Sequence, residues 1–129
     1  MLRINDIAPN FDANTTAGKI NFHSFLDNSW GILFSHPKDF TPVCTTELGY
    51  MAKIESDFSK RNCKIIGLSV DSVAQHKEWQ KDIEETQNAK VNYPLIADET
   101  LDIAKLYNML PADEDASEKR TAMTNATVR

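Results

Sequence analysis

Short apolar runs divide this chain into elements of regular length. Runs at residues 30–35, 63–70 and 94–97 predict three strands. The first two are apolar almost without interruption, which is typical of strands buried on both faces of a sheet. Two shorter segments, 11–14 and 19–22, flank Thr-Thr-Ala-Gly and predict an N-terminal β-hairpin.

Between these runs, apolar residues recur every three or four positions, which predicts helices. The first helix runs from Pro42 to about Lys60. Asp71 or Ser72 caps the second, whose buried face is expected to carry Val73, His76, Trp79 and Ile83. Asp98 caps a third helix that continues to Tyr107.

Alternating strands and helices form parallel crossovers, so the order predicts an α/β fold with a central, mainly parallel sheet flanked by helices. Residues 112–125 are polar and strongly charged, which predicts a mobile loop. Residues 126–129 predict the start of a further strand.

Composition limits the function classes. A chain of 129 residues forms one domain. The net charge of −5 argues against nonspecific binding to nucleic acid or anionic membranes. No membrane span or signal peptide is visible, and two cysteines make no disulfide framework, so a cytoplasmic location is expected.

The strongest chemical signal lies where the first helix begins. Thr41 is the candidate N-cap and Pro42 the first helical residue, so Cys44 stands at the third helical position. Unpaired backbone N–H groups and the positive end of the helix dipole favour a thiolate there, and the thiolate is the reactive form. Cys44 is therefore the candidate nucleophile. Position alone leaves a buried, inert cysteine equally open.

The sequence around Cys44 resembles the active site of the peroxiredoxins. Residues 34–48 read FSHPKDFTPVCTTEL, close to the motif His-Pro-x-Asp-Phe-Thr-Pro-Val-Cys-Thr-Thr-Glu of the single-cysteine branch. The resemblance covers nearly the whole chain, through the segments 8–11, 21–23, 64–72 and 93–98.

The resemblance implies a thioredoxin-like fold and a thiol-dependent peroxidase that reduces hydrogen peroxide and organic or lipid hydroperoxides. Cys44 would become a sulfenic acid, and an external thiol, either small or carried by a redox protein, would restore it. The family needs no cofactor for this reaction, and a homodimer is expected. Residues 1–129 are expected to be an incomplete domain, without the family's last strands and C-terminal domain.

The resemblance also assigns roles around the cysteine. Arg129 matches the active-site arginine, whose charged, forked donors suit a thiolate and peroxide oxygens. The Thr41 hydroxyl can reach the sulfur or a bound peroxide and can also act as a plain cap. Pro42 and Val43 are expected to shield the thiolate from water. His36 is a candidate for orienting the site, although a loop histidine is more often structural.

The second cysteine, Cys63, is expected to be a core residue of its strand. No resolving cysteine is then evident, which favours a single-cysteine enzyme. No grouping of histidine, cysteine and acidic residues has the spacing of metal ligands, so no metal is predicted.

Two other functions remain open. A noncatalytic thioredoxin-like binding or holdase module could retain the motif as scaffold. Phospholipase activity would use Ser29 and His23, because residues 27–31 partly match Gly-x-Ser-x-Gly. Asp27 replaces the first glycine, however, and Ser29 leads into a strand instead of the strained strand-to-helix turn of a lipase elbow.

Overall fold

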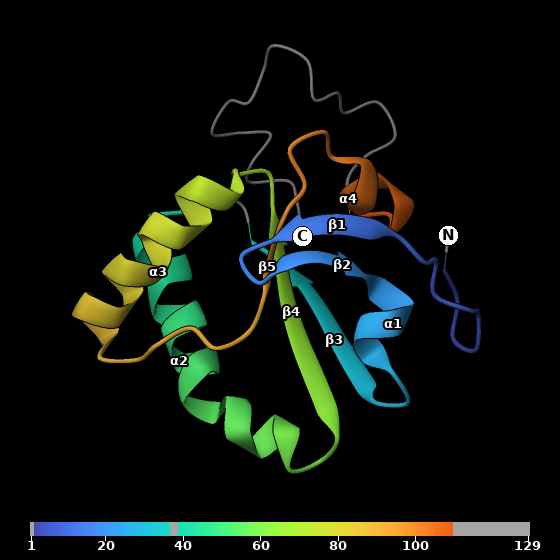
Figure 1. The fold of residues 1–129 in the computed structure, drawn as a ribbon, viewed down its shortest axis with the longest axis horizontal. Coiled ribbons are helices and arrows are strands. Elements are labelled where there is room, and N and C mark those ends of the chain that lie inside the picture. Colours follow the sequence, from blue (N-terminus) through green and yellow to red (C-terminus); the bar gives the residue numbers. More distant parts are fainter. Residues whose placement is uncertain (1, 37–38, 110–129) are drawn as a thin grey trace.

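The computed structural model describes residues 2–36 and 39–109 and contains one five-stranded sheet with helices on both faces (Figure 1). The elements in chain order are β1 (Asp12–Thr15), β2 (Gly18–Asn21), α1 (Phe22–Leu26), β3 (Trp30–Ser35), α2 (Pro42–Ser59), β4 (Cys63–Ser69), α3 (Val73–Gln87), β5 (Leu95–Ala97) and α4 (Asp102–Leu106). The predicted hairpin, strands and first two helices are therefore confirmed, with ends that shift by one or two residues.

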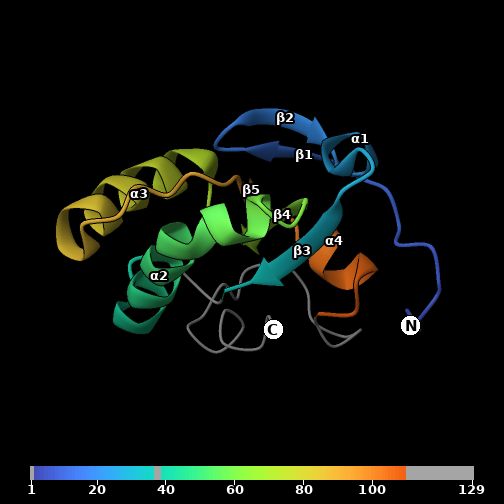
Figure 2. The same ribbon diagram turned by 90° about the horizontal axis from the view of Figure 1, so that it is seen from below.

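The strand order is β2-β1-β5-β4-β3. Strands β3, β4 and β5 are parallel, whereas β1 runs antiparallel to both β2 and β5. Helices α2 and α3 lie together on one face, and α1 and α4 lie on the other (Figures 1 and 2). The predicted fold class, a mainly parallel sheet flanked by helices and preceded by a hairpin, is confirmed.

Alternating side chains of β4 pack into two separate hydrophobic cores. Ile66 and Leu68 point toward α1 and α4, where they pack with Phe22 and Ile103. Ile65 points the other way and packs in the cluster that also holds Cys44, Leu48 and Trp79. Such alternation follows from the two-residue period of a strand and explains why β4 is apolar throughout.

The prediction that 30–35 is a buried strand is wrong for its first half. Trp30 is 77% exposed and Ile32 is 36% exposed. Among the described residues, strand β3 pairs only with β4, which leaves its other side without a partner strand in this part of the chain. An apolar run alone cannot tell an edge strand from a central one, because this difference depends on partners distant in sequence.

The third predicted helix is also shorter than expected. Of the two residues predicted as caps, Asp71 and Ser72, it is Ser72 that caps α3, with a capping box to Gln75. In α4, by contrast, Leu101 occupies the N-cap position with φ 64°, and Asp98 lies three residues earlier. The Asp98 carboxylate nevertheless accepts hydrogen bonds from the N–H groups of Ile103 and Ala104, at 3.1 and 2.8 Å. It therefore caps the helix from a distance.

The loop predicted at 112–125, the strand start at 126–129 and Arg129 itself lie outside the described residues. No helix in the described part of the chain is long and apolar enough to cross a membrane.

Candidate active site

Cys44 lies in the first turn of α2, where the sequence predicted it. Thr41 is the N-cap residue, in extended conformation and without a side-chain capping hydrogen bond, and Pro42 follows in the first turn. Cys44 is 6% exposed and packs in the same cluster as Leu48 and Trp79. Its neighbour Val43 is 66% exposed. The thiol is thus inside the fold, beside a helix N-terminus, one residue from an open surface.

The chain enters this helix through an uncommon backbone conformation. Phe40 has φ 61°, in the left-handed region that bulky residues rarely adopt. Such a conformation costs about 1–2 kcal/mol in a non-glycine residue. The N–H of Asp39, one residue earlier, donates to Asp71 Oδ2 at 2.7 Å, and the Phe40 ring lies 6.4 Å from the Trp79 ring. Contacts with β4 and α3 therefore hold the loop in this shape.

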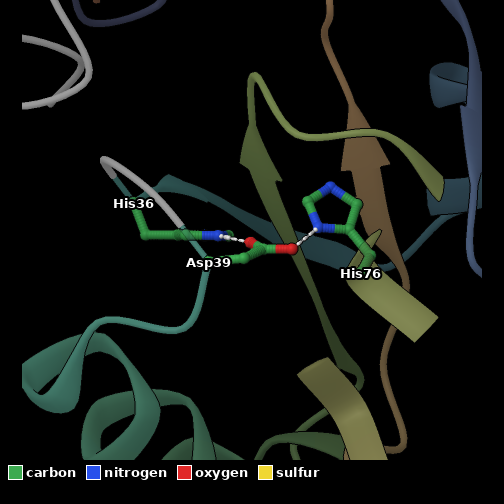
Figure 3. Close-up of side chains that lie close together, drawn as sticks. All are labelled: His36, Asp39 and His76. Atoms are coloured by element: carbon green, nitrogen blue, oxygen red, sulfur yellow. Dashed lines mark hydrogen bonds and ion pairs between the residues drawn. The ribbon is translucent and has the colours of Figure 1, made fainter. Parts of the chain in front are cut away.

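The loop carries a buried carboxylate between two histidines (Figure 3). His36 Nε2 lies 2.7 Å from Asp39 Oδ1, and His76 Nδ1 lies 2.6 Å from Asp39 Oδ2. His36 and Asp39 are each 3% exposed, and His76 is fully buried. The three side chains come from the end of β3, the loop before α2 and the first turns of α3, so the cluster joins three elements.

The hydrogen-bond partners fix the protons of His76. Its Nε2 lies 2.9 Å from the carbonyl oxygen of Ile96, which can only accept, so Nε2 carries a proton. Its Nδ1 faces a carboxylate, so Nδ1 donates as well. His76 is therefore an imidazolium paired with an ionised Asp39.

The pKa values of the pair shift in the directions that this assignment requires. Burial alone would raise the pKa of Asp39, but hydrogen bonds from His36 and His76 and their charge outweigh it and lower that pKa. Burial alone would lower the pKa of His76, but the hydrogen bond and charge of Asp39 outweigh it, with help from Ile96 and Asp71, and raise that pKa.

A second buried carboxylate supports the loop. Asp71, two residues after the end of β4, accepts the backbone N–H of Asp39. The hydroxyl of Ser69 lies 3.3 Å from Asp71 Oδ2 and 3.5 Å from Asp39 Oδ1. The end of β4 thus connects both carboxylates, and their negative charge favours a cationic His76.

Helix α3 also braces the first turn of α2. Trp79 Nε1 donates to the hydroxyl of Thr45 at 2.9 Å, and that hydroxyl donates to the carbonyl of Thr41 at 2.8 Å. The Trp79 ring lies 5.0 Å from the His36 ring. One indole therefore contacts both the loop and the helix that carries Cys44.

The cluster of His36, Asp39 and His76 could geometrically approach a metal, since one ligand atom from each lies within 4.8 Å of the others. The 2.6 and 2.7 Å separations are those of hydrogen bonds with a proton between the atoms. Both nitrogens of His76 are already used in such bonds. We therefore assign the cluster as a hydrogen-bonded network.

The structure brings together some predicted residues and adds others. Cys44, Thr41 and His36 belong to one region, whereas Arg129 lies outside the described residues. Sequence reasoning missed the roles of four residues: Asp39, Asp71, His76 and Trp79. The available signals were Asp39 inside the motif and a histidine on the apolar face of the second predicted helix.

Helix α2 separates the two cysteines. Cys44 is in its first turn, and Cys63 begins the strand that follows its last turn. With a rise of 1.5 Å per residue, the helix beyond Cys44 is about 22 Å long. A disulfide needs Cα atoms within about 7 Å. Both cysteines are free, as a single-cysteine site requires.

The serine and histidine of the phospholipase alternative bond to backbone carbonyl groups. Ser29 donates its hydroxyl to the carbonyl of Leu26, and His23 Nε2 lies 2.7 Å from the carbonyl of Ala8. Ser29 leads into β3, as the sequence indicated. This arrangement differs from a lipase elbow, in which the serine sits between a strand and a helix.

Comparison with known proteins agrees with the family resemblance seen in the sequence. The AhpC/TSA family pattern matches residues 4–128. The chain is 56% identical over 114 residues to a Dictyostelium discoideum protein named 1-Cys peroxiredoxin, and 56% identical over 119 residues to peroxiredoxin-6 of Homo sapiens. Each alignment covers 88% of this chain but 47% and 53% of the relative. The chain thus spans about half the length of the curated relatives it matches.

Solved structures agree. A yeast mitochondrial 1-Cys peroxiredoxin, described with a thiol resolving mechanism via glutathione/thioredoxin systems, matches with a TM-score of 0.91 at 51% identity, over 100% of this chain and 60% of that one. A cysteine-to-serine mutant of peroxiredoxin 6 of Arenicola marina matches with a TM-score of 0.82 at 49% identity, over 91% and 54%. The predicted thioredoxin-like fold and the resemblance to single-cysteine peroxiredoxins are confirmed.

Proposed function

Because the chain belongs to the AhpC/TSA family, we propose that it is a thiol-dependent peroxidase with Cys44 as its nucleophile. The observation that carries this proposal is the buried Cys44 in the first turn of α2, directly after a loop that the His36–Asp39–His76 network holds in place. The substrates are hydrogen peroxide and organic or lipid hydroperoxides, and the role is antioxidant defence.

In the reaction, the Cys44 thiolate attacks the terminal oxygen of the hydroperoxide. An S–O bond forms while the O–O bond breaks, and the departing oxygen takes up a proton and leaves as water or an alcohol. The cysteine is oxidised to sulfenic acid and the peroxide is reduced. An external thiol then reduces the sulfenic acid. Glutathione or a thioredoxin-type protein is proposed on the strength of the yeast relative.

Ionisation of the thiol cannot supply most of the rate. A free thiol is about 3% ionised at pH 7, so complete ionisation gains at most ~30-fold. The larger part must come from donors aimed at the charge that develops on the peroxide oxygens. Thr41 and Arg129 are proposed as these donors, with Pro42 and Val43 shielding the thiolate and His36 orienting the site.

The test compares two cysteine variants. One equivalent of peroxide should add a single oxygen to Cys44, measured by mass spectrometry of its peptide. Cys44→Ser should abolish peroxide turnover with an external thiol, whereas Cys63→Ser, the matched control, should keep it. Oxidation mainly at Cys63, or absent turnover in a well-folded chain, would favour the noncatalytic module instead.

We further propose a cytoplasmic homodimer, although the yeast relative carries a mitochondrial name. Four exposed apolar side chains, which lie on β3, at the entry to α2 and on α2 itself, support self-association: Trp30, Phe40, Val43 and Tyr50. Light scattering at micromolar concentration measures the oligomeric state, and a strict monomer would contradict the dimer.

A further inference from the structure

His76 is the element of the site least expected from sequence. It lies on α3, 37 residues from Asp39, yet it is fully buried and its Nδ1 bonds to Oδ2 of that carboxylate. Its other nitrogen bonds to the carbonyl of Ile96 on β5. His76 thus joins the loop before Cys44 to the centre of the sheet.

We propose that His76 is a positioning residue for Cys44 and that loss of its second proton sets the alkaline limit of the site. This rests on the proposed peroxidase function. His76 acts through Asp39, whose backbone leads through Phe40 and Thr41 into the first turn of α2.

The number of protons on the His76 ring decides how many hydrogen bonds it can donate. An imidazolium has two N–H donors, and both are used, toward Asp39 and toward Ile96. A neutral histidine has one donor. Deprotonation therefore removes one of these two bonds, and a buried acceptor loses its partner. The site is disturbed when the bond to Asp39 is the one that breaks, because Asp39 leads into the helix that carries Cys44.

The surroundings of His76 decide the direction of the effect. Asp39 faces it from the loop before α2 and Asp71 from the end of β4, and both are anionic. His36, at the end of β3, has its ring centroid 6.0 Å from that of His76 and is the other titratable group there. The Ile96 carbonyl faces it from β5. The two carboxylates favour the protonated ring, so the link is complete while His76 keeps both protons and is lost as the pH rises.

The pH dependence expected from His76 is opposite to that expected from the nucleophile, Cys44. Thiol ionisation makes Cys44 more reactive as the pH rises and then levels off. A site whose geometry also needs protonated His76 should pass through a maximum and fall at alkaline pH. The falling side is the signature of His76.

Two variants with neutral amide side chains test the two hydrogen bonds of His76 separately. In His76→Asn the amide nitrogen can take the place of Nδ1 and keep the bond to Asp39 without titrating. In His76→Gln the amide nitrogen can take the place of Nε2 and keep the bond to Ile96, but the bond to Asp39 is lost. Both remove the charge, so they are matched. His23→Asn, at an exposed histidine, is the control.

The expected results are distinct. For peroxide reduction, kcat/KM of the unmodified protein and of His23→Asn rises and then falls with pH. His76→Asn keeps most of the rate at pH 7 and loses the fall. His76→Gln loses about 10–100-fold at every pH, since misplacing a reacting group by ~1 Å can cost ~10²-fold. A fall that persists in His76→Asn, or a His76→Gln variant with unchanged rates, would overturn the proposal.

Two further measurements keep the test independent of turnover and of folding. The rate of Cys44 alkylation by iodoacetamide should show the same pH maximum, even if no peroxide is consumed. Absence of turnover with this maximum present would reject the peroxidase and retain the positioning role. In the unmodified protein, imidazole 15N resonances should show both nitrogens of His76 protonated at pH 7. A neutral ring there would refute the proposal even if every variant unfolds.

Discussion

Asp39 and Asp98 make an instructive pair of buried carboxylates. Each is 3% exposed, and each stands shortly before a helix, Asp39 before α2 and Asp98 before α4. The oxygens of Asp39 accept from two histidine side chains. Those of Asp98 accept from two backbone N–H groups of its own helix.

This difference in partners reverses the pKa shift. Burial raises the pKa of Asp98, and the N–H groups of Ala104 and Ile103 only partly offset it. Burial acts on Asp39 in the same sense, but charged and hydrogen-bonded histidines overcome it and lower the pKa. A carboxylate held by backbone donors organises structure alone, whereas one held by histidines also depends on their protonation.

The largest expected effect comes from Asp39→Asn. The neutral amide can accept from only one histidine and turns its own N–H groups toward the other, and the cationic His76 loses its anionic partner. Removing one partner of a buried pair costs about 3–5 kcal/mol. The midpoint of urea unfolding at pH 6 should fall accordingly, with an unchanged slope. A loss below ~1 kcal/mol would show that the pair adds little.

A smaller effect is expected from Asp98→Asn. One backbone N–H keeps an acceptor and the other loses it, but the variant also removes a charge whose burial is unfavourable. Unsatisfied buried groups cost about 1–3 kcal/mol, so the net loss should be near ~1 kcal/mol. Peroxide turnover per folded molecule should stay unchanged, which assays normalised by circular dichroism can measure. Lost turnover would mean that the α4 side also serves the site.

The smallest effect, and the sharpest contrast, lies in the pH dependence of stability. Folding lowers the pKa of Asp39 from its ordinary 3.8, so its stabilisation is present above that value and is lost as the pH falls through the folded pKa. Folding raises the pKa of Asp98, so its contribution is greatest below 3.8 and is lost as the pH rises through the folded pKa.

Unfolding free energies of the unmodified chain, minus those of each Asn variant, should therefore change in opposite directions between pH 5 and 3. The difference should shrink for Asp39→Asn and grow for Asp98→Asn. Each unit of pKa shift corresponds to about 1.4 kcal/mol. Parallel changes would contradict the assignment.

Features encoded by neighbouring residues were predictable. Pro42 at a helix start and a capping residue at 71 or 72 mark the N-termini of α2 and α3 correctly. The short α4 was not foreseen, because Leu101 takes a left-handed conformation that no local signal announces in a leucine. Its strain is compensated by burial, since Leu101 is 2% exposed.

The site was predictable only along one segment. Thr41 and Cys44 share a loop and helix turn, so their proximity follows from spacing alone. The contact between Asp39 and His76 depends instead on how α3 packs over β5. The same limit explains the error on β3. Whether Trp30 is covered depends on segments distant in sequence, and the apolar pattern of the strand does not reveal them.

The two tryptophans give the molecule two optical reporters of opposite character. Trp79 is fully buried, whereas Trp30 is 77% exposed. A soluble quencher such as acrylamide should silence Trp30 and leave the fluorescence of Trp79, whose indole contacts the His36 ring and the Thr45 hydroxyl. The remaining emission would come from the loop and helix turn around Cys44, so the site could be followed in real time without any attached label.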